Sequence, residues 1–129
     1  MTERSHPDFP KEMAEKLWGK KMAAKVEADL RRYHPKVGNV VAGLIRSYED
    51  PTIDDLKTKI MIVGTCLTAL GKPQMKMYML AALNNGVTEE QLWEMLRLVG
   101  VFAGEPTAVN GAVVLCEVLE GWNKRRITK

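Results

Sequence analysis

A chain of 129 residues with a formal net charge of +3 and 46% hydrophobic residues has the composition of one ordinary globular domain. This mild charge gives no reason to expect a nucleic-acid partner, and no apolar run approaches the roughly 18 residues of a membrane span. Because the first residues also lack the apolar stretch of a secretion signal, we expect a cytoplasmic protein that makes no membrane contact. We expect a single domain over residues 1–129, with flexible ends at 1–9 and 123–129.

Apolar residues recur three or four positions apart through most of the chain, which is the pattern of amphipathic α-helices. Prolines, glycines and capping residues separate these stretches. The sequence therefore predicts an all-α fold of six helices joined by short turns, at residues 10–33, 37–48, 54–70, 73–84, 88–102 and 106–122.

The first break follows from Pro35, because a proline disfavours helical backbone in the residue before it. The second break is "EDPTIDD", in which Thr52 or Asp54 is the expected N-cap of the third helix. Gly71 ends that helix and Pro73 opens the fourth, in keeping with glycine after a helix and proline at its start.

The fourth helix ends in "NNG", where Gly86 can take the left-handed conformation of a C-cap. "TEEQ" predicts a capping box, in which Thr88 and Gln91 each accept from the backbone of the other. Gly104 ends the fifth helix and Pro106 starts the sixth.

Two predicted helices are apolar on nearly every side: residues 77–83 are all apolar or aromatic, and the helix 88–102 is almost as rich. Such helices must be buried on most sides, and a chain of this length has little room for them. We therefore expect a homo-oligomer, with some of the eight methionines as adaptable contacts between copies. A monomer with a methionine-rich core is the alternative.

Cysteine and histidine are too sparse for a metal centre or a vicinal redox pair. Cys66 and Cys116 form no Cys-x-x-Cys motif, and both lie in mostly apolar helices where we expect plain core residues. His6 and His34 are scattered. We expect no metal and no cofactor.

Residues 56–112 carry six short motifs in a fixed order: "LKTK", "TALG", "AALNNGVT", "EEQLWEML", "FAGEP" and "VNGA". In order and spacing they resemble the core of the carboxymuconolactone decarboxylase family, and we take 54–122 as the family-like part. The resemblance implies an all-α fold that assembles as a homotrimer or homohexamer, with the active site near subunit contacts. It also implies removal of carbon dioxide from a small lactone acid without a cofactor. Related alkyl hydroperoxidase D-like proteins use a Cys-x-x-Cys pair instead.

The chain departs from this family at the titrating positions. The histidine of the family's "H-x-x-x-A-L" falls on Tyr78, and a second histidine falls on Leu98. The acidic residue four positions before the first histidine is Gln74, and the arginine of "KTR" is Lys59. Without a Cys-x-x-Cys pair, a thiol peroxidase is the least favoured activity.

Tyr78 and Glu105 are the candidate catalytic residues. A tyrosine with a pKa near 10 is a poor base at neutral pH, so Tyr78 would donate to an oxyanion or protonate a carbanion. Its alternative role is a packed ring whose hydroxyl meets a backbone carbonyl. Glu105 would point a carboxylate into the pocket, or cap the last helix.

Lys59, Gln74 and Asn110 are the candidate substrate-binding residues. Lys59 would hold a substrate carboxylate as a point charge, Gln74 would form hydrogen bonds without titrating, and Asn110 would reach the pocket. Solvation of Lys59 and helix capping by Asn110 are the structural alternatives. Two functions stay open: a cofactor-free decarboxylase, or related lyase or isomerase, acting on a small organic acid or lactone, and a non-catalytic ligand-binding or structural oligomer.

Overall fold

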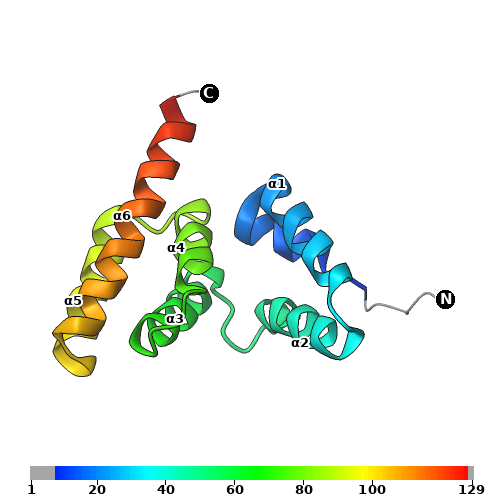
Figure 1. Ribbon diagram of the computed structural model, residues 1–129, viewed down its shortest axis with the longest axis horizontal. Helices are drawn as coiled ribbons and strands as arrows, with labels where there is room; N and C mark the ends of the chain where they lie inside the picture. The colour runs from blue at the N-terminus through cyan, green and yellow to red at the C-terminus, as the bar shows by residue number, and fades with distance from the viewer. Residues whose placement is uncertain (1–7, 128–129) are drawn as a thin grey trace. The chain divides into compact units, whose positions relative to one another are not determined.

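The computed structural model describes residues 8–127, with side chains up to Arg125, and the described part is entirely helical (Figure 1). The expected all-α fold of six helices is confirmed. The elements are α1 (Lys11–Arg32), α2 (Pro35–Arg46), the 3-10 turn η1 (Ser47–Glu49), α3 (Leu56–Ala69), α4 (Met75–Asn84), α5 (Glu89–Ala103) and α6 (Glu105–Ile127).

Contacts along the chain cluster into two compact units, residues 1–54 and residues 55–129. The first contains α1, α2 and η1, and the second contains α3 to α6. The single domain expected over residues 1–129 stays a prediction. Of the flexible ends expected at 1–9 and 123–129, residues 1–7 and 128–129 lie outside the described residues. Among residues 8–127, no helix combines the length and the apolar character that crossing a bilayer demands.

In the first unit, α1 and α2 lie side by side, and Leu17, Leu30 and Ile45 are buried. The continuous helix expected at 10–33 is wrong in one respect, because it breaks at Gly19, where φ is 82° and ψ is 166°. Only glycine adopts this backbone region readily, so the kink is encoded by one residue.

Helix α2 begins at Pro35, earlier than the expected Val37. Proline is well suited to the first helical position, because the backbone N–H that it lacks would have no partner inside the helix. His34 serves as the N-cap, and its Nδ1 accepts from the backbone of Lys36 at 3.2 Å. His34 and Pro35, which follow the end of α1, therefore also start α2.

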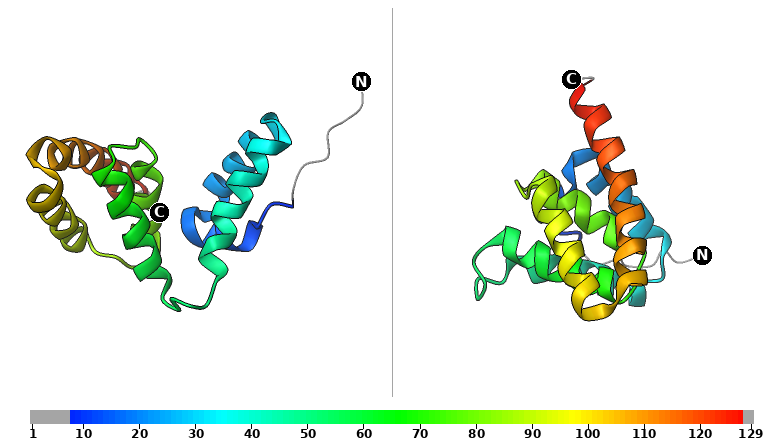
Figure 2. Two further views of the ribbon diagram at one scale, coloured as in Figure 1. Left: turned by 90° about the horizontal axis from the view of Figure 1, so that it is seen from below. Right: turned by 90° about the vertical axis from the view of Figure 1, so that its left-hand side faces the viewer.

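In the second unit, α5 and α6 form an antiparallel pair, and α3 and α4 pack on each other and on α6 (Figures 1 and 2). The three helices α3, α5 and α6 meet at Gly111. A Cβ atom there would lie 2.6 Å from Leu96 Cδ2 and 2.9 Å from Thr68 Cγ2. Only a glycine lets the helices approach this closely.

Helix α4 is buried on most sides, as the sequence predicts, and seven of its ten residues are buried. Its start is later than expected: residues 73 and 74 form a turn and the helix begins at Met75. At its other end Gly86 has φ 88°, and Val87 donates to the Ala82 carbonyl at 2.9 Å. The C-cap predicted at Gly86 is confirmed.

The remaining helix ends are mixed in outcome. The capping box at α5 is confirmed, since Thr88 and Gln91 exchange hydrogen bonds of 2.9 and 3.1 Å. The N-cap of α3 is Asp55, so the expectation of Thr52 or Asp54 is wrong. Helix α6 starts one residue before Pro106 and continues beyond Trp122 to Ile127.

The two cysteines are not core residues, contrary to expectation: both Cys66 and Cys116 are free and exposed. They lie on α3 and α6. Each helix turns one face to the core and one outward, and the apolar neighbours of a cysteine in sequence do not decide on which face it lies.

Candidate functional site

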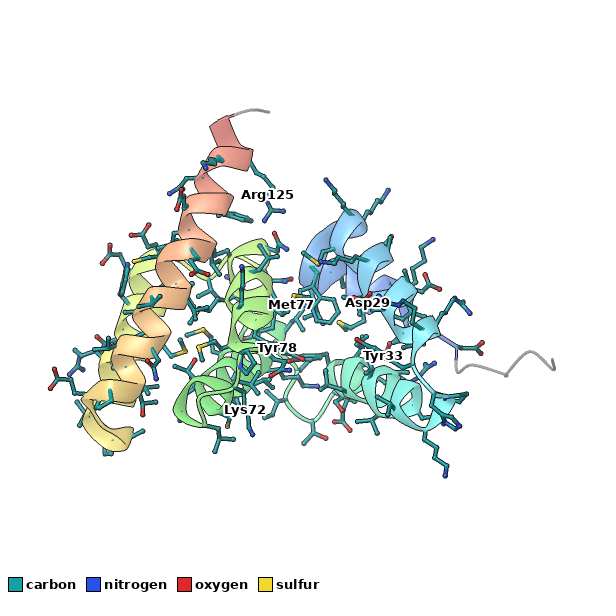
Figure 3. All side chains as sticks on the ribbon, viewed as in Figure 1. Asp29, Tyr33, Lys72, Met77, Tyr78 and Arg125 are labelled. Carbon is teal, nitrogen blue, oxygen red and sulfur yellow. The ribbon has the colours of Figure 1, made fainter. Side chains whose placement is uncertain are left out.

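Tyr78 lies in the middle of α4 and is 5% exposed (Figure 3). Gly64 of α3 faces it: a Cβ atom on that glycine would lie 3.8 Å from Tyr78 Cβ. The aromatic side chain therefore leaves its helix at a point where α3 carries no side chain. Close packing of this kind restricts the ring to few rotamers.

The other four predicted residues come from three different segments. Lys59 is half-buried on α3 and precedes the buried Ile60. Gln74 is exposed in the turn before α4, where its side chain makes no capping hydrogen bond. Glu105 and Asn110 are exposed in the first turns of α6.

Within one chain, Glu105 lies far along α6 from the part of that helix that is near the start of α4. Lys76 Nζ, two residues before Tyr78 on α4, lies 3.8 Å from Glu117 Oε2 on α6. Glu105 precedes Glu117 by more than three helical turns, which is about 18 Å along the axis. A single chain therefore holds Lys59 and Tyr78 on helices in contact, α3 and α4, and places Glu105 near a different end of the unit.

Exposed apolar side chains gather near Glu105, at the corner where α5 turns into α6. We call this set the α5–α6 corner; it consists of Leu98, Val101, Phe102, Val109 and Val113, between 43% and 86% exposed. Phe102 is the most exposed of them at 86%. Leu98, in the position of the second family histidine, is the least exposed of the set at 43%. The burial expected for helix five is therefore incomplete in one chain.

A cavity of about 640 Å³ opens on another side of α3, in the same unit. It is lined by residues of α3, the α4–α5 turn and α5, namely Asp55, Lys57, Thr58, Met61, Ile62, Thr65, Cys66, Val87 and Gln91. None of the five predicted site residues lines it. Its polar residues were missed because threonine and lysine at helical spacing are typical of a solvated helix face.

Among the described side chains, three exposed groups have shifted pKa values. The Thr58 hydroxyl donates to Asp55 Oδ2 at 2.5 Å and holds the pKa of that carboxyl below its usual value. A hydrogen bond from Arg97 lowers the pKa of Glu94, and the same pair raises the pKa of Arg97. Glu94 is thus an exposed carboxylate paired with Arg97.

Comparison with known proteins identifies one family. The model of the carboxymuconolactone decarboxylase family matches residues 49–115, just over half of the chain. Searches of curated proteins and of solved structures give no match. The matched segment contains α3, α4, α5 and the first half of α6, and so includes Tyr78 and all five predicted site residues.

Proposed function

The chain belongs to the carboxymuconolactone decarboxylase family, and from this premise we propose that it is a cofactor-free lyase or isomerase of a small carboxylated or enolisable compound. The substrate class is a small organic acid or lactone. The observation that carries the proposal is Tyr78, a phenol in the family's histidine position that is 5% exposed and packed opposite Gly64.

The chemistry of decarboxylation fits a phenol in that place. When carbon dioxide leaves, the electron pair of the broken bond stays on carbon and spreads onto a neighbouring carbonyl oxygen. The ordinary pKa of a phenol is about 10, and a phenol hydroxyl is a hydrogen-bond donor suited to that oxygen. The Tyr78 proton then transfers to the carbon, which completes the reaction, and a water molecule returns a proton to Tyr78.

The remaining residues have supporting roles in this proposal. Lys59 is half-buried on α3, the helix that faces Tyr78, and would attract a substrate carboxylate as a point charge. Gln74, just before α4, would form a hydrogen bond with an uncharged part of the substrate. Asn110 precedes Gly111, where α6 meets α3, and would form a hydrogen bond with the substrate. Glu105 lies more than three turns of α6 before Glu117, so it would act on the Tyr78 of another copy.

That last point requires an oligomer, and the exposed side chains of the α5–α6 corner support one. Phe102, Val101 and Val113 are each more than half exposed. Burial of apolar surface is the main driving force of association, at roughly 25 cal/mol per Å². We propose a homotrimer or homohexamer in which this corner packs against a neighbouring copy and brings Glu105 with it.

Substituting Tyr78 by phenylalanine tests the catalytic role. The variant keeps the ring and removes the hydroxyl, so carbon dioxide release from β-keto acids and carboxylated γ-lactones should fall by about tenfold or more. Tyr33→Phe, which removes an exposed phenol from α1's C-cap, should keep the wild-type rate. Equal turnover by Tyr78→Phe and wild type would eliminate Tyr78 as the donor.

A non-catalytic ligand-binding oligomer is the second candidate. The 640 Å³ cavity favours it, because none of the five predicted site residues lines that cavity. In this case neither wild type nor Tyr78→Phe releases carbon dioxide from any compound of the panel, while binding of small acids persists.

A further inference from the structure

The cavity on α3 lies on a different face of that helix from Tyr78. Ile60, Gly64 and Thr68, each four residues apart, form the row that is buried towards the core. Thr58, Met61 and Thr65 form a second row, and all three line the cavity. Gly64 faces Tyr78 Cβ, so Tyr78 packs against the buried row and the cavity opens beside the second row.

Hydrogen bonds within the chain determine whether the hydroxyls in the cavity can still donate to a ligand. The Thr58 hydroxyl donates to Asp55 Oδ2 at 2.5 Å, and the Thr65 hydroxyl donates to the Met61 carbonyl at 2.6 Å. A hydroxyl has a single proton to donate. Both threonine oxygens therefore face a ligand as hydrogen-bond acceptors, and they call for a donor on the ligand.

Gln91 and Lys57 form the wall of the cavity that supplies donors. Gln91 Oε1 accepts from the Thr88 backbone at 2.9 Å, which fixes the amide and leaves Nε2 to donate. The side chain of Lys57 lies along the turn that ends α4: a Cβ atom on Gly86 would lie 3.2 Å from Lys57 Nζ. The negative end of the α4 dipole favours the ammonium there. A ligand oxygen with negative charge would complement this wall.

Met61, Ile62 and Val87 provide the apolar part of the lining. The volume of about 640 Å³ falls in the range of small-molecule sites. Asp55, also in the lining, keeps its charge because it is paired with Thr58, so it would repel a second carboxylate on the ligand. These features fit one acidic group, one hydroxyl and a short apolar body.

We propose that this cavity binds a small hydroxy-substituted monocarboxylic acid. Its carboxylate lies against Lys57 and Gln91, its hydroxyl donates to Thr58 or Thr65, and its apolar body covers Met61 and Val87. The site does not depend on the proposed function, since Tyr78 takes no part in it.

Cys66 offers a direct measure of occupancy, because it lines the cavity and is exposed, while the exposed Cys116 on α6 does not line it. The full chain is alkylated with iodoacetamide, and the rate at each cysteine is followed by peptide mass spectrometry. The probes are 4-hydroxyphenylacetate, 4-hydroxybenzoate and 4-hydroxybutyrate. With a bound probe at about ten times its Kd, Cys66 should react about tenfold more slowly, because about one site in ten is then empty. Cys116 should react at its original rate.

Matched variants separate the carboxylate contact from general effects. In Lys57→Met, about tenfold more probe should be needed for the same protection of Cys66, because a charge-assisted hydrogen bond is lost. Lys72→Met, an exposed lysine outside the cavity, should keep full protection. The amide 4-hydroxyphenylacetamide should protect less than the acid. Tyr78→Phe should change nothing in this assay, which separates this proposal from the enzymatic one.

Three results would overturn the proposal. The first is no slowing at Cys66 by any of the three acids up to their solubility limits. The second is equal protection in Lys57→Met and wild type. The third is a Cys66 that does not react before any probe is added while Cys116 does, because the cavity would then be covered by another copy.

Discussion

At the scale of single residues, short polar side chains decide the character of each surface of α3. Thr68 is fully buried and donates to the Gly64 carbonyl at 2.7 Å, which fixes its methyl group towards α6. Thr58 and Thr65 donate in the same local way on the outer face, and so present oxygens to the cavity. Threonine thus packs in the core on the buried face of α3 and provides polar lining on the face towards the cavity.

The bond between Thr58 and Asp55 has a measurable consequence for titration. The hydrogen bond lowers the pKa of Asp55 below its unfolded value, so the stability it contributes is present above that value and lost as the pH falls through the folded pKa. Thr58→Val should therefore raise the pKa of Asp55, as seen by NMR titration of its carboxyl carbon. Thr107→Val, on α6, should leave it unchanged. An Asp55 midpoint that is the same in Thr58→Val and wild type would contradict this.

At this scale the sequence predicts candidate site residues, but it does not determine which way the side chains of a helix face. Tyr78, Lys59 and Gln74 are found from the family motifs, but Cys66 and Cys116 were expected in the core and are exposed. Helix α3 mixes apolar and small polar residues around its circumference, so periodicity alone leaves its rotation undetermined. The cavity needs the α4–α5 turn beside α3, a contact between segments that the sequence pattern does not specify.

At the scale of elements, Gly111 controls how closely α3, α5 and α6 approach. Thr68 Cγ2 would be 2.9 Å from an added Cβ and cannot easily retreat, because Thr68 is held by its bond to Gly64. Leu96, 3% exposed, has little free space into which to move. A methyl group at Gly111 must therefore spread the helices apart.

Gly111→Ala should lower the free energy of unfolding by about 1–3 kcal/mol, the usual effect of overpacking a core. Gly121→Ala is the matched control on the same helix, where an added Cβ meets nothing within 4 Å. It should raise the free energy of unfolding by about 0.5–1 kcal/mol through helix propensity. Urea denaturation measures both; equal stability of the two variants would disprove the crossing argument.

Local signals predict helix ends well where a side chain or a glycine acts within its own turn, as in the capping box at Thr88 and the C-cap at Gly86. They fail at Gly19, because the apolar spacing from Met13 to Leu30 continues across it as if the helix were unbroken. Pro35 shows a third case, in which one proline both ends a helix and starts the next. A residue that acts on two helices in this way shifts the predicted start of the second helix by a few residues.

At the scale of the whole molecule, the apolar content seen in the sequence is only partly buried by one chain. Helix α4 is buried, but the α5–α6 corner is exposed, with Phe102 at 86%. Family membership follows from α3 to α6 alone, and residues 1–48 lie outside the matched segment. Association between copies leaves no periodic signal in a sequence; what the sequence predicts is the excess of apolar surface on which the proposed association rests.

We propose that copies of this chain join through the α5–α6 corner, which brings Glu105 of one copy to the Tyr78 of another. Multi-angle light scattering on the full chain measures this most directly. We expect a mass of three or six times 14.5 kDa for the unmodified chain, and a smaller mass for Phe102→Glu because the charge weakens the apolar contact. A mass of 14.5 kDa for the unmodified chain would contradict it.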